Sequence, residues 1–328
     1  MHDDDLLAEF DALAAKLANA RAALKAVVFG QDAVIDLALG SLLAGGHGLI
    51  VGAPGLAKTL LVESIGTVLG LSAKRVQFTP DLMPGDVIGS EVLEESADGK
   101  RAFRFVKGPV FCQLLMADEI NRASPRTQSA LLQAMQERHV TVAGERHDLP
   151  APFHVLATQN PIEQEGTYPL PEAQLDRFLV QINIDYPPAD AEKKMLAATT
   201  GAETASLTPA MTSEELQRAQ TLVRAMPIAE RLVDGTLSLI RAMRPTDDAS
   251  AKMRAWVRWG PGPRASQALV LAARAAALLD GRRAPSSEDM RRLAKPVLRH
   301  RTALTYAALQ DGVTIDGLID DLCSEHLA

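Results

Sequence analysis

The sequence predicts an α/β domain, with a parallel sheet between helices, followed by a smaller all-helical domain. Strand-like apolar runs alternate with helix-like segments up to about residue 188, and this alternation is typical of a parallel sheet with helices on both faces. After Asp185-Tyr-Pro-Pro188 the strand patterns disappear and helical patterns follow one another. A chain of 328 residues is long enough for about two domains.

The elements of the α/β domain can be assigned in order. Residues 5–26 have the spacing of an amphipathic helix, and a second helix is expected from Asp32, as its cap, through Leu43. Residues 79–109 are expected to be irregular, with a polar excursion at 94–104. The other expected elements are strands at 48–51, 73–78, 113–117, 153–158 and 178–184, helices at 58–69 and 124–138, and a hairpin at 139–149.

These patterns divide the chain into an N-terminal helix (1–26), an α/β core (27–188), a linker (189–210) and a helical lid domain (211–328). The core is expected to contain inserts at about 79–110 and 139–149. In the helical domain, Thr212-Ser-Glu-Glu215 has the capping-box pattern of a helix start, and Ser286-Ser-Glu-Asp289 opens another helix.

The loop after the first core strand is the most informative segment. Gly52-Ala-Pro-Gly-Leu-Ala-Lys-Thr59 follows the apolar run Gly48–Val51, a layout in which backbone N–H groups and the helix dipole bind phosphate. Lys58 would reach the β- and γ-phosphates, and the Thr59 hydroxyl would hold Mg²⁺. The usual pattern has glycine where Ala57 stands, and alanine is free of steric cost there only if its backbone is helical.

Polar side chains end two of the expected strands. The apolar run Leu114–Ala117 is followed by Asp118 and Glu119, and side chains at the carboxyl end of a strand face the same crevice as the phosphate loop. Asp118 would hold Mg²⁺ through water and Glu119 would deprotonate an attacking water, although two solvated acids after a strand are common. Asn160 ends the next strand and could position that water, but Asn-Pro is also a turn signal by itself.

Two arginines leave alternatives open. Arg177 precedes the last core strand, where it is either a salt-bridged surface residue or an arginine finger that reaches the γ-phosphate of a neighbouring subunit. Arg264 starts a helix, where the dipole disfavours a cation. A compensating anion is therefore expected beside Arg264, either a phosphate or a nearby carboxylate.

Composition restricts the partners and the compartment. The net charge is −7, with the acidic excess in residues 1–188, and only 4% of residues are aromatic, so an extensive nucleic-acid surface is not expected. Cys112 and Cys323 lie far apart with no C-x-x-C partner, which fits a reducing compartment and argues against zinc. Without a signal-peptide pattern or an uninterrupted apolar span, a cytoplasmic protein with no membrane span is expected.

Taken in order, the motifs resemble those of the AAA+ ATPases, and more narrowly those of the MoxR family. The resemblance covers the chain from about residue 20 onward. The stretch Asn160–Phe178 is the most characteristic. The other matching motifs are Gly30-Gln31, Gly52–Thr59 with its Ala57, Met116–Glu119, Asp118–Arg122, Thr158–Asn160, Leu175–Phe178 and Trp259–Ala265.

The resemblance implies a role for each matching residue. Asp118 and Thr59 would hold Mg²⁺, Glu119 would activate water, and Asn160 would be the residue called sensor 1. Arg177 would be the finger acting on the adjacent subunit's ATP, and Arg264 would be sensor 2 on the helical lid. The two inserts would line the pore or rim of a ring. The residues implied in ATP binding are Val28, Gly30, Gln31, Gly52, Ala53, Pro54, Gly55, Leu56, Ala57, Lys58, Thr59 and Leu60.

The function implied by the resemblance is a homo-oligomeric ring, with a hexamer as the expected size, that hydrolyses ATP with Mg²⁺ and remodels a client protein by changing the lid angle. A partner with a von Willebrand factor A domain and a chaperone-like role in maturing or activating protein complexes are also implied. The alternatives are a metal-chelatase subunit with similar inserts, a nucleic-acid motor, which the acidic core disfavours, and a poorly hydrolysing scaffold, which Glu119 disfavours.

Overall fold

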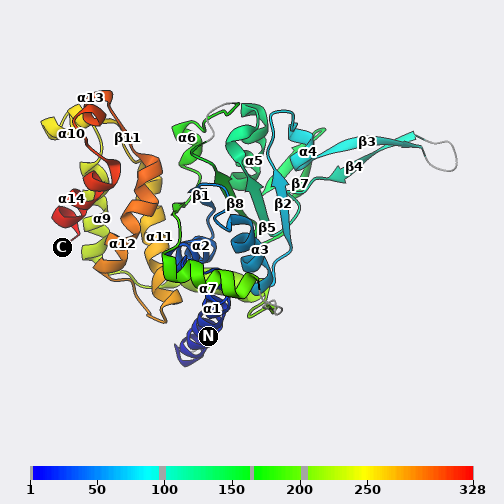
Figure 1. Ribbon diagram of the computed structural model, residues 1–328, viewed down its shortest axis with the longest axis horizontal. Helices are drawn as coiled ribbons and strands as arrows, with labels where there is room; N and C mark the ends of the chain where they lie inside the picture. Colours follow the sequence, from blue (N-terminus) through cyan, green and yellow to red (C-terminus); the bar gives the residue numbers. More distant parts are fainter. Residues whose placement is uncertain (1–2, 96–100, 163–165, 201–205, 328) are drawn as a thin grey trace.

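The computed structural model describes residues 3–95, 101–162, 166–200 and 206–327 and contains the expected α/β core and helical lid (Figure 1). The core is built on a parallel sheet with the strand order β2-β5-β8-β1-β9. This order places β8 between the strand that leads to the phosphate loop and the strand that leads to the acid pair. The strands are β1 (Gly48–Gly52), β2 (Ala73–Gln77), β5 (Leu114–Asp118), β8 (His154–Gln159) and β9 (Val180–Ile184).

The inner strands β1, β5 and β8 are buried on both faces of the sheet, whereas most side chains of the edge strand β2 are exposed. Successive side chains of each strand point to opposite faces. Ile50 and Met116 pack on one face against helices that come before and directly after β1. Leu49 and Leu115 pack on the other face against the helix that follows β5. The helices of the core are α1 (Asp3–Lys25), α2 (Asp32–Leu43), α3 (Lys58–Val68), α5 (Pro125–Glu137) and the short α6 (Glu172–Leu175), with a 3-10 turn η1 (Ile120–Arg122).

Helix starts follow the sequence signals with one exception. The Ser124 hydroxyl accepts a hydrogen bond from the Thr127 amide at the start of α5, and capping boxes form at Thr212 and Ser286. The exception is Asp32, which was expected to cap α2. Gln31 occupies the capping position without a side-chain bond, and Asp32 lies in the first turn, where it accepts from Lys25 Nζ at 2.8 Å.

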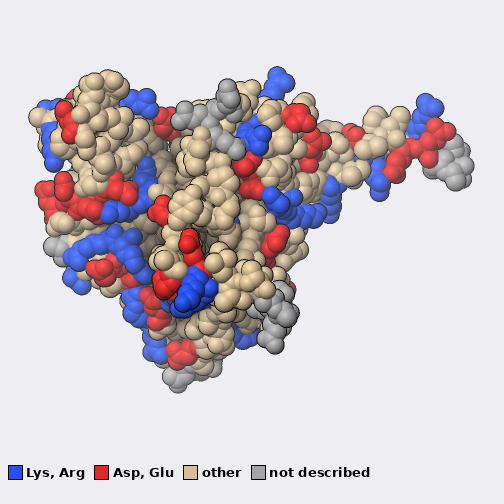
Figure 2. Space-filling view, viewed as in Figure 1, with Lys and Arg blue, Asp and Glu red and all other residues tan. Residues whose placement is uncertain are grey.

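The expectation that residues 79–109 are irregular is wrong. This segment contains α4 (Pro84–Ile88) and an antiparallel hairpin of β3 (Gly89–Glu95) and β4 (Arg101–Lys107), while residues 96–100 lie outside the described residues. The hairpin extends away from the sheet as a narrow arm with side chains of both charges (Figures 1 and 2). Most side chains on both of its faces are exposed, so it lacks the apolar–polar alternation that marks a half-buried strand.

The hairpin expected at 139–149 forms from β6 (His139–Val142) and β7 (Glu145–Asp148). The expected linker contains a helix, α7 (Ala189–Thr199), and its residues 201–205 lie outside the described residues. The lid is helical apart from one short ladder of β10 (Val257–Trp259) and β11 (Ala303–Leu304). Its helices are α8 (Ser213–Ala225), α9 (Glu230–Ala242), α10 (Ala251–Trp256), α11 (Pro263–Leu279), α12 (Ser287–Leu298), α13 (Tyr306–Gln310) and α14 (Ile315–His326), with a 3-10 turn η2 (Arg299–Arg301).

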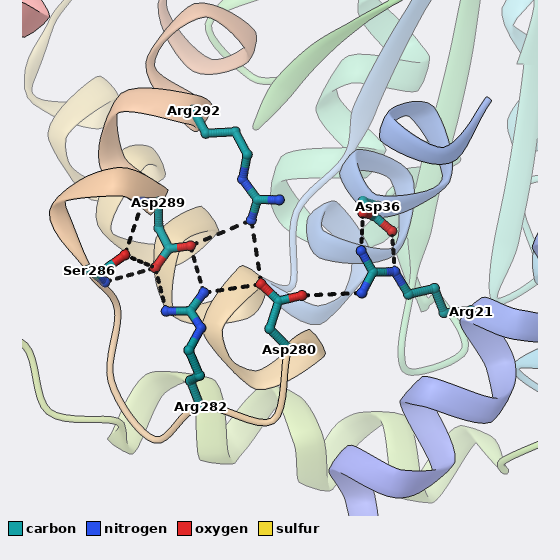
Figure 3. Close-up of polar contacts among 7 residues, drawn as sticks. All are labelled: Arg21, Asp36, Asp280, Arg282, Ser286, Asp289 and Arg292. Atoms are coloured by element: carbon teal, nitrogen blue, oxygen red, sulfur yellow. Dashed lines mark hydrogen bonds and ion pairs between the residues drawn. The ribbon is translucent and has the colours of Figure 1, made fainter. Parts of the chain in front are cut away.

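The lid and the core share one apolar cluster, which runs from α1, α2 and α3 into α11 and α12. A chain of ion pairs closes the edge of this junction (Figure 3). Arg21 of α1 binds Asp36 of α2 and, at 3.2 Å, Asp280 at the end of α11. Asp280 in turn accepts from Arg282, which donates two bonds of 2.7 Å to Asp289 of α12. Within the described residues, none of the helices combines the length and apolar character needed to cross a membrane.

Candidate functional site

The phosphate loop lies between the carboxyl end of β1 and the first turn of α3. No side chain caps α3, so its first backbone N–H groups remain available to an anion. Lys58 Nζ donates to the Gly52 carbonyl oxygen at 2.8 Å, which holds the ammonium group beside the loop. Gly52 has no room for a side chain, because a Cβ there would lie 2.7 Å from the Ile184 carbonyl oxygen. The loop can therefore surround a phosphate with backbone donors and one lysine.

Ala57 occupies the left-handed region, with φ 56° and ψ 24°. Alanine at this position would be free of steric cost only in a right-handed helical backbone, and Ala57 does not have one. For a residue with a Cβ this conformation costs about 1–2 kcal/mol. Neighbouring Gly55, at φ 81°, adopts positive φ without that penalty. The loop thus contains backbone strain at the position where the usual pattern has glycine.

A pocket of about 380 Å³ adjoins the loop, and Gly52, Ala53, Leu56 and Asp185 are among the residues that line it. The segment Val28–Gln31 reaches the same edge of the sheet. Gln31 Nε2 donates to the Asp185 carbonyl oxygen at 2.8 Å. Gly30 has φ 70° and lies so near α7 that a Cβ would approach the Ala191 Cβ to 2.6 Å.

Asp118 ends β5 as a buried carboxylate, 8% exposed. The Thr158 hydroxyl donates to its Oδ1 at 2.6 Å, and Arg75 donates to its Oδ2 from Nη2 at 2.6 Å and from Nε at 3.2 Å. Arg75 comes from β2, which pairs with β5. The sequence reasoning missed Arg75, because it belongs to a strand whose side chains are mostly exposed.

Glu119 is held by its neighbours in an unusual backbone conformation. Its φ of 55° and ψ of 49° are left-handed, a strain that is often found at functional sites. Its Oε2 accepts from Gln77 Nε2 at 2.7 Å and from Arg122 Nη1 at 2.9 Å. Gln77 also accepts from Arg75 at 3.0 Å. The two missed residues of β2 therefore link both acids, and their only sequence signal is the i, i+2 spacing that puts them on one face of a strand beside the acids.

Asn160 follows β8 and is 3% exposed. Its Oδ1 accepts from the Ile162 amide at 3.1 Å, whereas its Nδ2 has no hydrogen-bond partner among the described residues. A buried donor without an acceptor costs about 1–3 kcal/mol. Because β8 lies between β5 and β1, this amide lies between the acid pair and the phosphate loop, and a ligand oxygen there would satisfy it.

Arg177 and Arg264 lie near the amino ends of the strands, opposite to the carboxyl ends that carry the phosphate loop. We call this side of the sheet the arginine edge. Arg177 precedes β9, whose first residue is level with the first residue of β1, whereas the phosphate loop follows the last residue of β1. Arg177 Nη1 donates to the Leu132 carbonyl oxygen at 2.7 Å. Arg264 Nη1 forms an ion pair with Asp176 Oδ2 at 3.8 Å. The anion expected beside Arg264 is thus present within the chain.

The comparisons with known proteins agree with this architecture. Residues 47–180 match the model of the ATPase family associated with various cellular activities (AAA), and residues 253–322 match the AAA lid domain. A solved structure from Cytophaga hutchinsonii, described as that of a candidate ATPase, superposes with a TM-score of 0.90 at 33% identity and covers 98% of this chain and 97% of that chain. The fold and the site therefore define an AAA-type ATPase with its lid.

Two curated relatives narrow the assignment. Chaperone MoxR1 of Mycobacterium tuberculosis is 41% identical over 298 residues, which is 90% of this chain and 78% of that protein. Protein MoxR of Paracoccus denitrificans is 34% identical over 313 residues, which covers 89% of this chain and 90% of that protein. The chain belongs to the MoxR family of AAA+ ATPases.

Proposed function

We propose that this protein hydrolyses ATP with Mg²⁺ as a subunit of a homo-oligomeric ring and thereby remodels a client protein. The observation that carries the proposal is the separation of the candidate residues onto two edges of one sheet. The phosphate loop, the acid pair and Asn160 lie at the carboxyl edge, and Arg177 and Arg264 lie at the other. A nucleotide site of this kind is complete only when the arginine edge of a second subunit approaches it, and we expect a hexamer.

At the carboxyl edge each side chain suits one task. Lys58 and the N–H groups of α3 would bind the phosphates, and Glu119 would accept a proton from the attacking water. The Asn160 Nδ2 group would donate to an oxygen of the water or of the γ-phosphate. The Thr59 hydroxyl and the Asp118 carboxylate are hard oxygen donors of the kind that Mg²⁺ prefers. When bound, Mg²⁺ would neutralise part of the phosphate charge.

The position of Arg264 supports a particular use of the lid. Because Arg264 lies beside Asp176, adjacent to Arg177 in sequence, it would act from the arginine edge on the neighbour's nucleotide and not on the loop of its own chain. Both arginines would then respond to the neighbour's γ-phosphate. Loss of that phosphate would free Arg264 on the lid and Arg177 of the same subunit from the neighbour's nucleotide at the same time.

The β3–β4 arm is the best candidate for contact with the client. Leu93 and Phe103 are cross-strand neighbours on it and both are exposed, Phe103 at 69%, with exposed Val92 next to Leu93; exposed apolar side chains that lie next to one another favour contact with a partner. We propose a partner with a von Willebrand factor A domain and a role in the maturation of protein complexes, and both proposals rest on the family alone.

The buried free thiols of Cys112 and Cys323 support a reducing compartment such as the cytoplasm.

Glu119→Gln tests the hydrolytic proposal. The amide keeps the size of the side chain but cannot accept the proton, so turnover is expected to fall at least about 100-fold while nucleotide binding persists. Phosphate release and the affinity for a fluorescent ATP analogue measure the two effects. The control is Glu137→Gln, at the end of α5 and paired with His139, which is expected to keep turnover. Undiminished hydrolysis in Glu119→Gln would remove Glu119 from the mechanism.

Arg177→Ala tests the proposed contact between subunits. The variant alone is expected to lose turnover, because each site lacks its finger. Mixing it with Lys58→Ala subunits is expected to restore part of the activity, since an intact finger then meets an intact phosphate loop. Turnover measured across mixing ratios gives the answer, and no recovery at any ratio would contradict action between subunits.

A further inference from the structure

Arg301 is a buried lid residue whose guanidinium contacts the segment that carries Arg177. It lies in η2, directly after α12, and is 2% exposed. Its Nε donates to Asp176 Oδ1 at 2.8 Å, and its Nη2 donates to the carbonyl oxygens of Phe178 at 2.6 Å and Asp176 at 3.2 Å. Its Nη1 donates to the carbonyl oxygens of Leu179, at 3.0 Å, and Val297.

These contacts use all five N–H groups of the guanidinium. Four of the five acceptors belong to residues 176–179, and the fifth belongs to Val297 in α12. His300 adds a further contact, with its Nε2 3.1 Å from the Phe178 carbonyl oxygen. The backbone on both sides of Arg177 is therefore fixed to the end of one lid helix.

The chemistry of this contact requires arginine. A lysine has one nitrogen and cannot reach carbonyl groups spread along four residues, whereas the planar guanidinium presents five donors in fixed directions. A buried cation is tolerated only when it is paired and fully hydrogen-bonded, and Asp176 supplies the charge. The side chain of Arg177 lies outside this set of contacts and contacts Leu132 instead.

We infer that Arg301 is a positioning residue for Arg177, holding residues 176–179 so that the finger is presented to the neighbouring subunit's nucleotide. The inference rests on the proposed role of Arg177 between subunits. It also gives the lid a direct connection to that finger, because a displacement of α12 and η2 must move the carbonyl groups that Arg301 binds.

A purely structural role for Arg301 predicts a different set of measurements. If Arg301 only joined the lid to the core, its replacement would lower the melting temperature and leave turnover per folded ring unchanged. If it positions Arg177, its replacement lowers kcat while the nucleotide affinity of the same chain's phosphate loop persists. The loss of kcat should then be reversed in mixed rings, at the sites where the altered chain supplies only the phosphate loop and the neighbouring chain supplies an intact Arg177 and Arg301.

The experiment compares Arg301→Lys with Arg282→Lys. Arg282 is also a lid arginine with a bidentate carboxylate, Asp289, and its other partner in the ion-pair chain is Asp280 at the end of α11 (Figure 3). Rings of each variant are checked by light scattering and melting, and then kcat, KM and binding of a fluorescent ATP analogue are measured. We expect kcat of Arg301→Lys to fall at least tenfold with affinity within twofold, and Arg282→Lys to stay within twofold in both.

Mixing supplies the readout that a structural role would not give. Arg301→Lys mixed with Lys58→Ala should regain activity to the same extent as Arg177→Ala mixed with Lys58→Ala. A kcat for Arg301→Lys within twofold of Arg282→Lys overturns the inference, as does failure to regain activity under conditions where the Arg177→Ala mixture recovers. Full turnover in Arg177→Ala alone would instead overturn the finger itself and with it the proposed function.

A milder variant keeps the test decisive if Arg301→Lys does not form rings. Asp176→Asn keeps every backbone acceptor of Arg301 and removes the charge of the carboxylate that Arg301 shares with Arg264. We expect a reduction of kcat of at least threefold that mixing with Lys58→Ala reverses. Unreduced kcat in Asp176→Asn would overturn the inference.

Discussion

Acidification is expected to destabilise this protein well above the pH at which carboxylates are protonated, because three histidines are buried in neutral form. Burial, with a smaller effect of His154, lowers the pKa of His47 to about 3. Burial also lowers the pKa of His154 to about 4. Burial, followed by the nearby cation Arg301, lowers the pKa of His300 well below its usual value. Each ring is nevertheless hydrogen-bonded, His47 and His154 to backbone groups at the start of the sheet.

The direction and size of the effect follow from proton linkage. A histidine in the unfolded chain binds a proton below about pH 6.5, whereas these three bind none in the folded chain until far lower pH. The stability they support is therefore complete above about pH 6.5 and is lost as the pH falls. Below pH 6.5 each of these histidines lowers the free energy of unfolding by about 1.4 kcal/mol per pH unit, which is about 2 kcal/mol at pH 5. The three together therefore remove about 6 kcal/mol at that pH. Native domains have only about 5–15 kcal/mol in total.

Urea unfolding at pH 7.5, 6.5, 5.5 and 5.0 at constant ionic strength measures this loss, with circular dichroism and tryptophan fluorescence as two probes of a single transition. The slope of the free energy of unfolding against pH should approach three protons between pH 5 and 6. His154→Gln should reduce it to about two, and His147→Gln, on the β6–β7 hairpin, is the control. A wild-type slope of one proton or less would refute the reasoning.

Two further predictions concern the strained and restrained residues of the site. Ala57→Gly is expected to raise the free energy of unfolding by about 0.5–1 kcal/mol, because relief of the left-handed strain exceeds the entropy that glycine adds to the unfolded chain; a lower melting temperature would contradict this. Gln77→Ala removes a donor to Glu119 worth about 1 kcal/mol, so basal phosphate release is expected to rise up to about fivefold. Unchanged release would show that Gln77 does not restrain Glu119.

The sequence allows the central sheet and the phosphate loop to be predicted because both leave strong local signals. Leu114–Ala117 and Gly48–Val51 are short apolar runs followed by polar or glycine residues, and near-continuous apolar runs bounded in this way are typical of buried parallel strands. The Ser124 and Thr212 caps are equally local, since a side chain and an amide three residues away suffice to form them.

Other parts depend on contacts that a linear pattern does not show. The β3–β4 arm is exposed on both faces, so no alternation reveals it. Arg75 and Gln77 lie among exposed positions of β2 and gain their meaning only when β5 pairs beside them. Arg301 is 125 residues from Asp176, and nothing near it in sequence distinguishes it from a surface arginine. Ala57 needed a backbone angle to settle whether alanine is strained there.

The apolar cluster shared by α1, α2, α3, α11 and α12 has a consequence for how the chains would move in the proposed ring. Separating the lid from the core would expose buried side chains such as Leu39 and Leu269, at about 1.5–3 kcal/mol each. Four such side chains would already cost about 6–12 kcal/mol. Each chain should therefore tilt as one stiff body. The flexible joints of the ring would then fall between chains, at the boundaries where one protomer's arginine edge meets the next protomer's phosphate loop.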